Sequence, residues 1–193
     1  ITIWIRFPVK STSNQLLEGA DIVIWTTTPW TIPSNKALAY GENIEYGVYQ
    51  WEDNKIVLAT SLAESVKEAA QIENWELRGT LNGKDLEGTI CQHPLNGQGY
   101  NEDRPLLAGD FVTDDAGTGF VHIAPSHGED DYFLWLEHFG ANDIPDNVTD
   151  DGKFREHVPL FAGTEVYTQK GEMGGGNFAV LKALKEADKL LAK

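Results

Sequence analysis

The first two-thirds of the chain consists mainly of short runs in which apolar residues alternate with polar ones or cluster together, a pattern that predicts strands. Residues 1–9 alternate, whereas residues 21–25 are continuously apolar, as is typical of a buried strand. Residues 46–51 and 55–60 flank a short polar loop, which predicts a β-hairpin. Further strands are predicted at residues 75–81, 86–91, 111–113 and 119–124, the first two of these separated by the turn signal Asn82-Gly83.

Three stretches carry helix signals. Ser61 followed by Glu64 forms a capping-box pattern, which predicts that a helix begins at Ser61. A second helix is predicted over residues 129–139, and a third is predicted to start with Asn177 as its cap and to run to the end of the chain with Leu181, Leu184 and Leu191 on its apolar side. Short strands with a few helices predict a single α+β domain over residues 1–193, with a barrel-like, mainly antiparallel β core.

Charge and composition narrow the possible functions. The chain has 30 acidic and 15 basic residues, a net charge of −15, which argues against a general nucleic-acid binder but not against binding one RNA end. Residues 102–151 hold 13 acidic residues and one basic residue, Arg104. The lone cysteine, Cys91, excludes an internal disulfide and a multi-cysteine zinc site. No apolar run approaches the roughly 20 residues of a membrane span.

The first segment with candidate chemistry is a strand that runs into small polar residues. It reads Trp25-Thr26-Thr27-Thr28-Pro29-Trp30-Thr31-Ile32-Pro33-Ser34-Asn35. Proline cannot donate to a strand ladder, so the strand must end near Pro29 and present threonine hydroxyls and backbone amides there. The alternative is a strand rich in β-branched threonine that is followed by an ordinary turn.

The second segment places two histidines and three acids around a strand-to-helix turn. It reads Gly117-Thr118-Gly119-Phe120-Val121-His122-Ile123-Ala124-Pro125-Ser126-His127-Gly128-Glu129-Asp130-Asp131-Tyr132. Asp131 would either stabilise a helix N-terminus or hold a substrate ammonium group, and His122 would be either a core histidine or a pocket residue. The spacing of His122, His127, Asp131 and His138 matches no familiar zinc signature, which leaves metal binding as a minor alternative.

Together the two segments resemble the signature segments of the editing domain of isoleucyl-tRNA synthetases, the insertion called connective polypeptide 1 (CP1). The spacing of the segments and the chain length fit that insertion. Thr28 and Trp30 stand where valyl and leucyl enzymes carry an arginine and an acid, so the isoleucyl type is favoured over the valyl or leucyl type. Ser34 and Ser126 are small departures, at positions where other members often carry Ala and Gly. The resemblance implies a domain excised from a cytoplasmic synthetase, with both ends leading to the missing catalytic body.

The resemblance also implies an activity and a set of site residues. The pocket that activates isoleucine discriminates poorly against an amino acid one methylene smaller, and these synthetases are the standard example of this limit. The resemblance therefore implies a second site that excludes isoleucine. This site would hydrolyse the ester between valine and the isoleucine tRNA, and it would also hydrolyse valyl-adenylate. The implied partners are the valine-carrying 3′ end of tRNA(Ile), valyl-adenylate and the rest of the synthetase, with no metal, no cofactor and a monomeric state. The implied catalytic residues are Thr26, Thr27, Thr28 and Asp131, and the implied substrate-binding residues are Trp25, Trp30, Asn35, His122, Gly117, Thr118 and His127.

Two other function classes stay open at the level of sequence. One is a module that holds the tRNA end without hydrolysing it in isolation, and the other is a metallohydrolase. In the editing-domain interpretation no side chain is an obvious general base, so a water molecule oriented by hydroxyl and backbone groups is expected to attack the ester.

Overall fold

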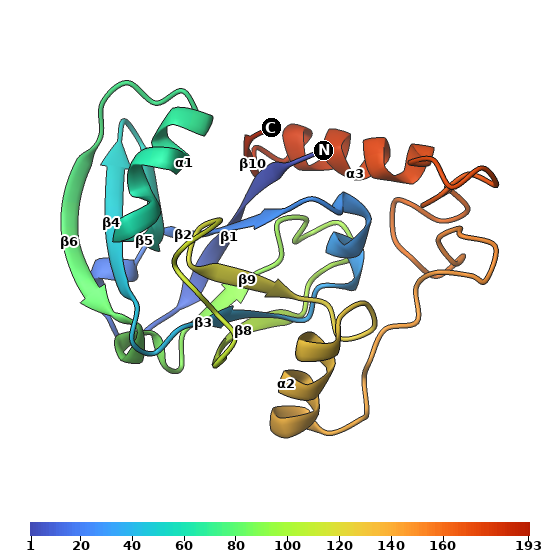
Figure 1. Ribbon diagram of the computed structural model, residues 1–193, viewed down its shortest axis with the longest axis horizontal. Helices are drawn as coiled ribbons and strands as arrows, with labels where there is room; N and C mark the ends of the chain where they lie inside the picture. The colour runs from blue at the N-terminus through green and yellow to red at the C-terminus, as the bar shows by residue number, and fades with distance from the viewer.

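The computed structural model describes residues 1–193 and contains strands, three α-helices and four short 3-10 helices (Figure 1). The strands are β1 (Ile3–Ser11), β2 (Asp21–Thr26), β3 (Ala37–Tyr40), β4 (Glu45–Trp51), β5 (Asn54–Ala59), β6 (Glu76–Asn82), β7 (Ile90–Gln92), β8 (Asp103–Ala108), β9 (Phe120–Ile123) and β10 (Leu190–Ala192). The helices are α1 (Ala63–Ala69), α2 (Glu129–Phe139) and α3 (Gly175–Glu186), and the 3-10 helices are η1 (Gln15–Leu17), η2 (Pro29–Ser34), η3 (Thr60–Leu62) and η4 (Gly83–Leu86).

All strands join in one sheet, in the order β6-β4-β5-β2-β1-β7-β8-β3-β9, with β10 paired to β1. Only the pairs β2–β5 and β3–β8 are parallel, so the predicted mainly antiparallel α+β fold is confirmed. The long strand β1 pairs with β2 over most of its length and with β7 near its end, and it thereby links the two halves of the sheet. The last strand of the path, β9, returns to pack beside β2, which gives the core its barrel-like shape.

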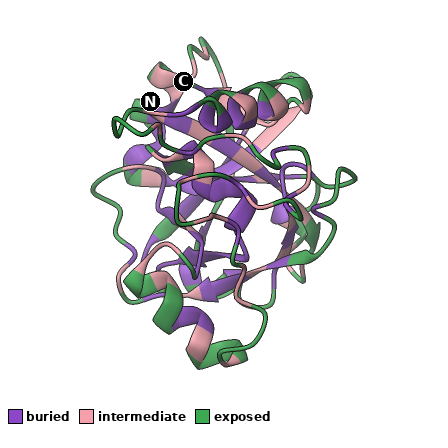
Figure 2. Cartoon of the chain, turned by 90° about the vertical axis from the view of Figure 1, so that its right-hand side faces the viewer, coloured by how far each residue is buried: buried purple, intermediate pink, exposed green.

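Buried residues concentrate in the strands at the centre of the molecule, and exposed residues occupy the surrounding loops and the outer faces of the helices (Figure 2). Tyr46 is fully buried, and its hydroxyl donates to the Gly119 carbonyl oxygen at 2.6 Å and accepts from the Gly41 N–H at 2.9 Å. This contact ties β4 to the start of β9. Helix α3 packs against η2, and neither α3 nor the other helices are long and apolar enough to cross a membrane.

The elements with the strongest local patterns are confirmed. The predicted hairpin is the β4–β5 pair, in which Trp51 faces Asn54 across a two-residue turn. Helix α2 has the predicted bounds, and β2 and β9 lie within one or two residues of the predicted strands.

Two helix starts were predicted at the wrong residue. Ser61 does not cap α1, because it lies within η3, which precedes that helix. The Ser61 hydroxyl instead donates to the Asp114 carbonyl oxygen at 3.0 Å. Asn177 is buried in the first turn of α3, where its side-chain amide donates to the Val166 carbonyl oxygen, and Gly174 is the N-cap. The third helix also ends at Glu186, so Leu191 belongs to β10 and pairs back toward β1 rather than extending a helix.

Of the predicted strands, one is absent and another is only partly formed, and three strands were not predicted. Residues 111–113 form a turn in which the Val112 N–H bonds the Gly109 carbonyl oxygen. A capping box from Asn82 to Asp85 begins η4, which ends at Leu86 and is followed by a turn in which the Thr89 N–H bonds the Leu86 carbonyl oxygen. Of the strand predicted over residues 86–91, only the end is formed, as part of the three-residue strand β7. Of the three unpredicted strands, β3 and β8 pair with each other in parallel, and β10 lies where the third helix was predicted to continue.

Candidate active site

The threonine segment forms one wall of a cavity at the end of β2. Thr26 is the last residue of the strand, and its hydroxyl oxygen accepts from the Thr28 N–H at 3.1 Å and lies 3.2 Å from the Thr28 hydroxyl oxygen. Pro29 then begins η2, and the Thr31 hydroxyl within η2 donates to the Thr28 carbonyl oxygen at 2.9 Å. The polar groups of Thr26 and Thr28 are therefore held at the strand end by local bonds.

The second segment forms the opposite wall. His122 lies on β9, which pairs with β3, and the chain then turns into α2. The Asp131 carboxylate, in the first turn of α2, accepts a hydrogen bond from the Ala124 N–H at 2.8 Å. A Cβ atom on Gly128 would lie 2.8 Å from Asp131 Oδ1, so a side chain at this position would displace the carboxylate.

The two walls enclose a cavity of about 240 Å³. Seven of the predicted site residues line it, namely Trp25, Thr26, Thr27, Thr28, His122, His127 and Asp131, and so do Thr31, Val121, Ala124 and Gly128. Because β9 packs beside β2, segments that are far apart in the sequence meet here.

The other four predicted site residues lie outside this cavity. Asn35 is buried behind His122, and Trp30 packs edge-on against the His127 ring, with the ring centres 4.6 Å apart. Gly117, with φ of 76°, lies against the Trp25 ring, whereas Thr118 is buried and its carbonyl oxygen accepts from the Ala59 N–H. In this structure these residues support the cavity walls.

The charge state of the cavity is set by burial. Burial, together with a smaller effect of the neighbouring His127, lowers the pKa of His122 to about 4. Burial also lowers the pKa of His127. For Asp131, burial raises the pKa, while the hydrogen bond from the Ala124 N–H opposes that shift. Asp131 is the one acidic residue that lines the cavity, which makes it the group able to hold a cation there.

His122 has a hydrogen-bonding partner at each ring nitrogen. Its Nε2 lies 2.9 Å from the Thr31 hydroxyl oxygen, and its Nδ1 lies 3.1 Å from Asn35 Nδ2. The Nε2 atom of His127 lies 3.2 Å from the Ser34 hydroxyl oxygen, which also accepts from Asn147. Both imidazoles are therefore held by side chains rather than by the backbone.

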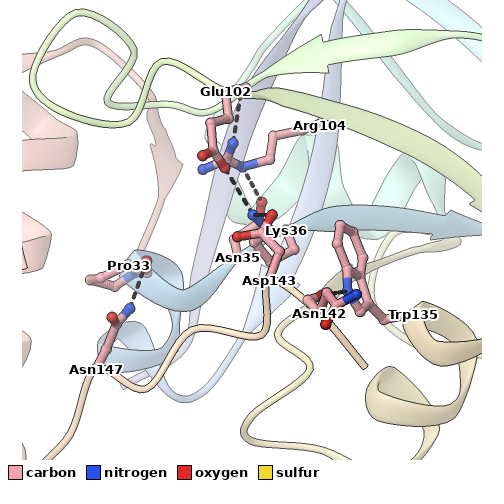
Figure 3. Close-up of polar contacts among 9 residues, drawn as sticks. All are labelled: Pro33, Asn35, Lys36, Glu102, Arg104, Trp135, Asn142, Asp143 and Asn147. Atoms are coloured by element: carbon pink, nitrogen blue, oxygen red, sulfur yellow. Dashed lines mark hydrogen bonds and ion pairs between the residues drawn. The ribbon is translucent and has the colours of Figure 1, made fainter. Parts of the chain in front are cut away.

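Several residues of this site were missed by the sequence analysis. Thr31 and Ser34 stand within the first quoted segment, but nothing in their local pattern distinguishes them from turn residues. Asn147 and Arg104 contact this segment from distant positions, and Asn147 donates to the Pro33 carbonyl oxygen (Figure 3). The available signal for Arg104 was its place as the only basic residue in an acidic stretch.

The four residues weighed as metal ligands do not come together. His138 lines a separate hollow beside α2 together with Glu137, away from His122 and His127. Nowhere in the chain do three or more histidine, cysteine, aspartate or glutamate side chains form a group that could hold a metal ion.

The chain is similar in sequence to isoleucine–tRNA ligases. It is 44% identical to the enzyme of Caulobacter vibrioides over 100% of this chain and 21% of that protein, and 44% identical to the enzyme of Pelagibacter ubique over 99% and 21%. The chain thus spans about a fifth of the length of these relatives. No family model matches the chain.

Solved structures with a similar fold include leucyl-tRNA synthetase editing domains. The editing domain of the P. knowlesi cytosolic leucyl-tRNA synthetase has a TM-score of 0.62 at 12% identity, with 100% of this chain and 96% of that chain covered. A crystal structure described as GlLeuRS-CP1 has a TM-score of 0.59 at 21% identity, with 75% of this chain and 63% of that chain covered.

The fold is therefore that of the editing domains of aminoacyl-tRNA synthetases, with the two signature segments brought together at one cavity. By sequence, the chain is a segment of the isoleucine–tRNA ligase family, and the resemblance to the isoleucyl enzymes is confirmed.

Proposed function

We propose that this chain hydrolyses valine that has been attached to the isoleucine tRNA, and that it also hydrolyses valyl-adenylate. The observation that carries the proposal is the single cavity lined by Thr26, Thr27 and Thr28 on one wall and by His122 and Asp131 on the other. This cavity offers one carboxylate for an ammonium group and several hydroxyl and amide groups for an ester and a water molecule.

The reaction is the hydrolysis of an acyl ester. A water oxygen adds to the valyl carbonyl carbon, the bond from that carbon to the ribose oxygen breaks, and the ribose oxygen takes up a proton. The products are free valine and the tRNA with its terminal hydroxyl restored. With valyl-adenylate the leaving group is the phosphate oxygen of AMP.

Each wall has a distinct role in this proposal. The Asp131 carboxylate, fixed by the Ala124 N–H, binds the α-ammonium group of valine. The hydroxyl groups of Thr26 and Thr28, which contact each other at the strand end, orient the ester and the attacking water. His122 limits the depth of the cavity, so that the additional methylene of isoleucine meets the ring.

The proposed partners follow from the substrate. They are the 3′ end of tRNA(Ile) and the remainder of the synthetase chain, and the domain itself is proposed to be a monomer. Because the chain carries a net charge of −15, most of the contacts to the tRNA phosphates are assigned to other parts of the synthetase.

Asp131→Asn tests the proposal directly, with Asp130→Asn as a matched control. Both residues lie in the first turn of α2, but only Asp131 lines the cavity. Losing one charge-assisted contact of roughly 1.5–3 kcal/mol predicts a fall of about 10- to 100-fold in kcat/KM for valyl-tRNA(Ile), both in this chain and in a synthetase that carries it.

The Asp130→Asn variant is expected to keep the original rate. Equal rates for the original chain and a folded Asp131→Asn variant would contradict the role of Asp131. Binding of the tRNA end without hydrolysis in either protein would favour the binding-module alternative.

A further inference from the structure

Arg104 is a buried cation with no ion pair. It lies on β8 with 4% of its surface exposed, and no carboxylate lies within ion-pair distance of its guanidinium group. The neighbouring Glu102 side chain pairs with Lys36 at 2.8 Å instead (Figure 3). Burial lowers the pKa of Arg104 by more than the carboxylates of Glu102, Asp143 and Asp103 raise it from beyond ion-pair distance, and a buried charge without a direct partner is costly. The two hydrogen bonds that the guanidinium group donates therefore have to offset part of this cost, and they define what the residue positions.

One of these bonds fixes the orientation of Asn35. Arg104 Nε donates to Asn35 Oδ1 at 3.1 Å, and Arg104 Nη1 donates to the Glu102 carbonyl oxygen at 2.6 Å. A guanidinium group can only donate, so the Asn35 oxygen must face Arg104. The Ala37 carbonyl can only accept, and it receives a bond from Asn35 Nδ2 at 3.0 Å, which agrees with the same orientation.

The orientation of Asn35 in turn fixes the tautomer of His122. Asn35 Nδ2, a donor, lies 3.1 Å from His122 Nδ1, so this ring nitrogen must accept and carries no proton. The neutral ring therefore carries its proton on Nε2, and the Nε2–H donates to the Thr31 hydroxyl oxygen at 2.9 Å.

Hydrogen-bond donation continues in the same direction from His122 to the threonine wall of the cavity. With its oxygen accepting from His122, the Thr31 hydroxyl directs its own hydrogen to the Thr28 carbonyl oxygen at 2.9 Å. The donor roles of Arg104, Asn35 and His122 are thus fixed, and the Thr31 hydroxyl has the Thr28 carbonyl oxygen at 2.9 Å as a shorter contact than the Thr28 hydroxyl oxygen at 3.5 Å. The series ends at a peptide group of the threonine wall, which lines the cavity.

We propose that Arg104 is a positioning residue for the candidate active site, because its bond to Asn35 holds His122 as the Nε2–H tautomer and thereby directs the Thr31 hydroxyl to the Thr28 carbonyl oxygen, which the Thr31 N–H also bonds. The effect of Arg104 on hydrolysis rests on the proposed function, whereas its effect on the tautomer does not. The two parts can therefore fail separately.

The tautomer is read in the intact chain, without substrate, from the ¹⁵N shifts of the ring nitrogens. The signals of His122 among the five histidines are assigned by their loss in His122→Gln. The original chain is expected to show the Nε2–H form alone. In Arg104→Met, loss of the orienting hydrogen bond is expected to raise the Nδ1–H form to about a tenth or more of the population.

Two further variants distinguish the loss of the hydrogen-bond donor at position 104 from a general loss of structure. Arg104→Gln restores a neutral donor and is expected to return the ring to the Nε2–H form. Arg6→Met removes a partly buried arginine that pairs with Asp21 and donates to the Asn54 side-chain oxygen at 2.9 Å, and it is expected to leave the His122 shifts unchanged.

Asn35→Asp keeps the proposal testable if Arg104→Met does not fold. It presents only acceptors to His122 while leaving Arg104 paired, so the ring is expected to switch to the Nδ1–H form. An Nδ1–H ring in the original chain, unchanged shifts in a folded Arg104→Met variant, or an Nε2–H ring in Asn35→Asp would each overturn the proposal.

For hydrolysis, kcat for valyl-tRNA(Ile) is expected to fall about tenfold in Arg104→Met and to recover in Arg104→Gln.

Discussion

Two histidines that contact residues of η2 both have a lowered pKa, but their surroundings differ. His93 is fully buried, and its Nδ1 accepts from the Leu95 N–H while its Nε2 bonds the Ile32 carbonyl oxygen. His122 bonds the side chains of Thr31 and Asn35 and faces the cavity. Burial lowers the pKa of both rings, to about 3 for His93 and to about 4 for His122.

The comparison shows that a strongly shifted pKa does not by itself identify a functional histidine. His93 joins two backbone groups and stacks on Tyr100 with ring centres 4.6 Å apart, so its ring is part of the fold. His122 contacts only side chains at its two nitrogens and borders an open space. The two histidines differ in the kind of hydrogen-bonding partner and in whether a cavity adjoins the ring. This difference predicts that substitutions at His93 affect stability, whereas substitutions at His122 affect substrate selection.

The largest expected effect is on stability in His93→Ala. The substitution opens a cavity and leaves the Leu95 N–H and the Ile32 carbonyl unpaired, which together predict a loss of about 3–5 kcal/mol in the free energy of unfolding. His122→Ala is expected to lose less than half as much, because its ring adjoins a cavity that water can enter. Urea denaturation of both variants checks the difference, and equal losses would remove the distinction between the two histidines.

A smaller effect is expected from pH. The pKa of His93 in the fold, about 3, lies below its value in the unfolded chain, so the unfolded chain binds more protons between these two values. The contribution of His93 is fully present above about pH 6.5 and is lost as the pH falls toward its folded pKa. Between pH 7 and pH 5 this amounts to about 2 kcal/mol, and His122 acts in the same direction.

The pH effect is checked by urea denaturation of the original chain and of His93→Gln across this range. Glutamine keeps a donor and an acceptor but does not titrate, so the variant is expected to show a shallower decline toward pH 5. Parallel curves would mean that His93 does not contribute to the pH dependence of stability.

How much of this fold can be predicted from sequence depends on whether the deciding contacts are local. The β4–β5 hairpin and α2 follow from alternation and from helix signals within each segment, and both are confirmed. Strand β3 has no alternation because all four of its residues are buried, and Pro105 obscures β8. These two strands are defined by pairing with each other across a long stretch of chain, which no local pattern reports.

The residues of the candidate site likewise fall into those that local sequence patterns indicate and those that only long-range contacts bring in. The residues that line the cavity stand in two contiguous segments, whose unusual runs of threonine, histidine and acid could be recognised. The contacts that orient them could not, because Arg104 reaches Asn35 from a residue far along the chain, and Asn147 reaches Ser34 from still further. The sequence also gave no indication that Trp30 and Asn35 would lie behind the cavity rather than in it.

The most direct test of the account is the ratio of deacylation rates for valyl- and isoleucyl-tRNA(Ile), measured for the original chain, His122→Ala and His93→Gln, each also in a synthetase that carries the segment. The original chain is expected to favour the valyl substrate. Relief of a steric overlap of roughly 1–2 kcal/mol predicts that His122→Ala reduces this preference by about tenfold, while His93→Gln preserves it. Equal hydrolysis of both substrates by the original chain, or an unchanged preference in a folded His122→Ala variant, would contradict the account.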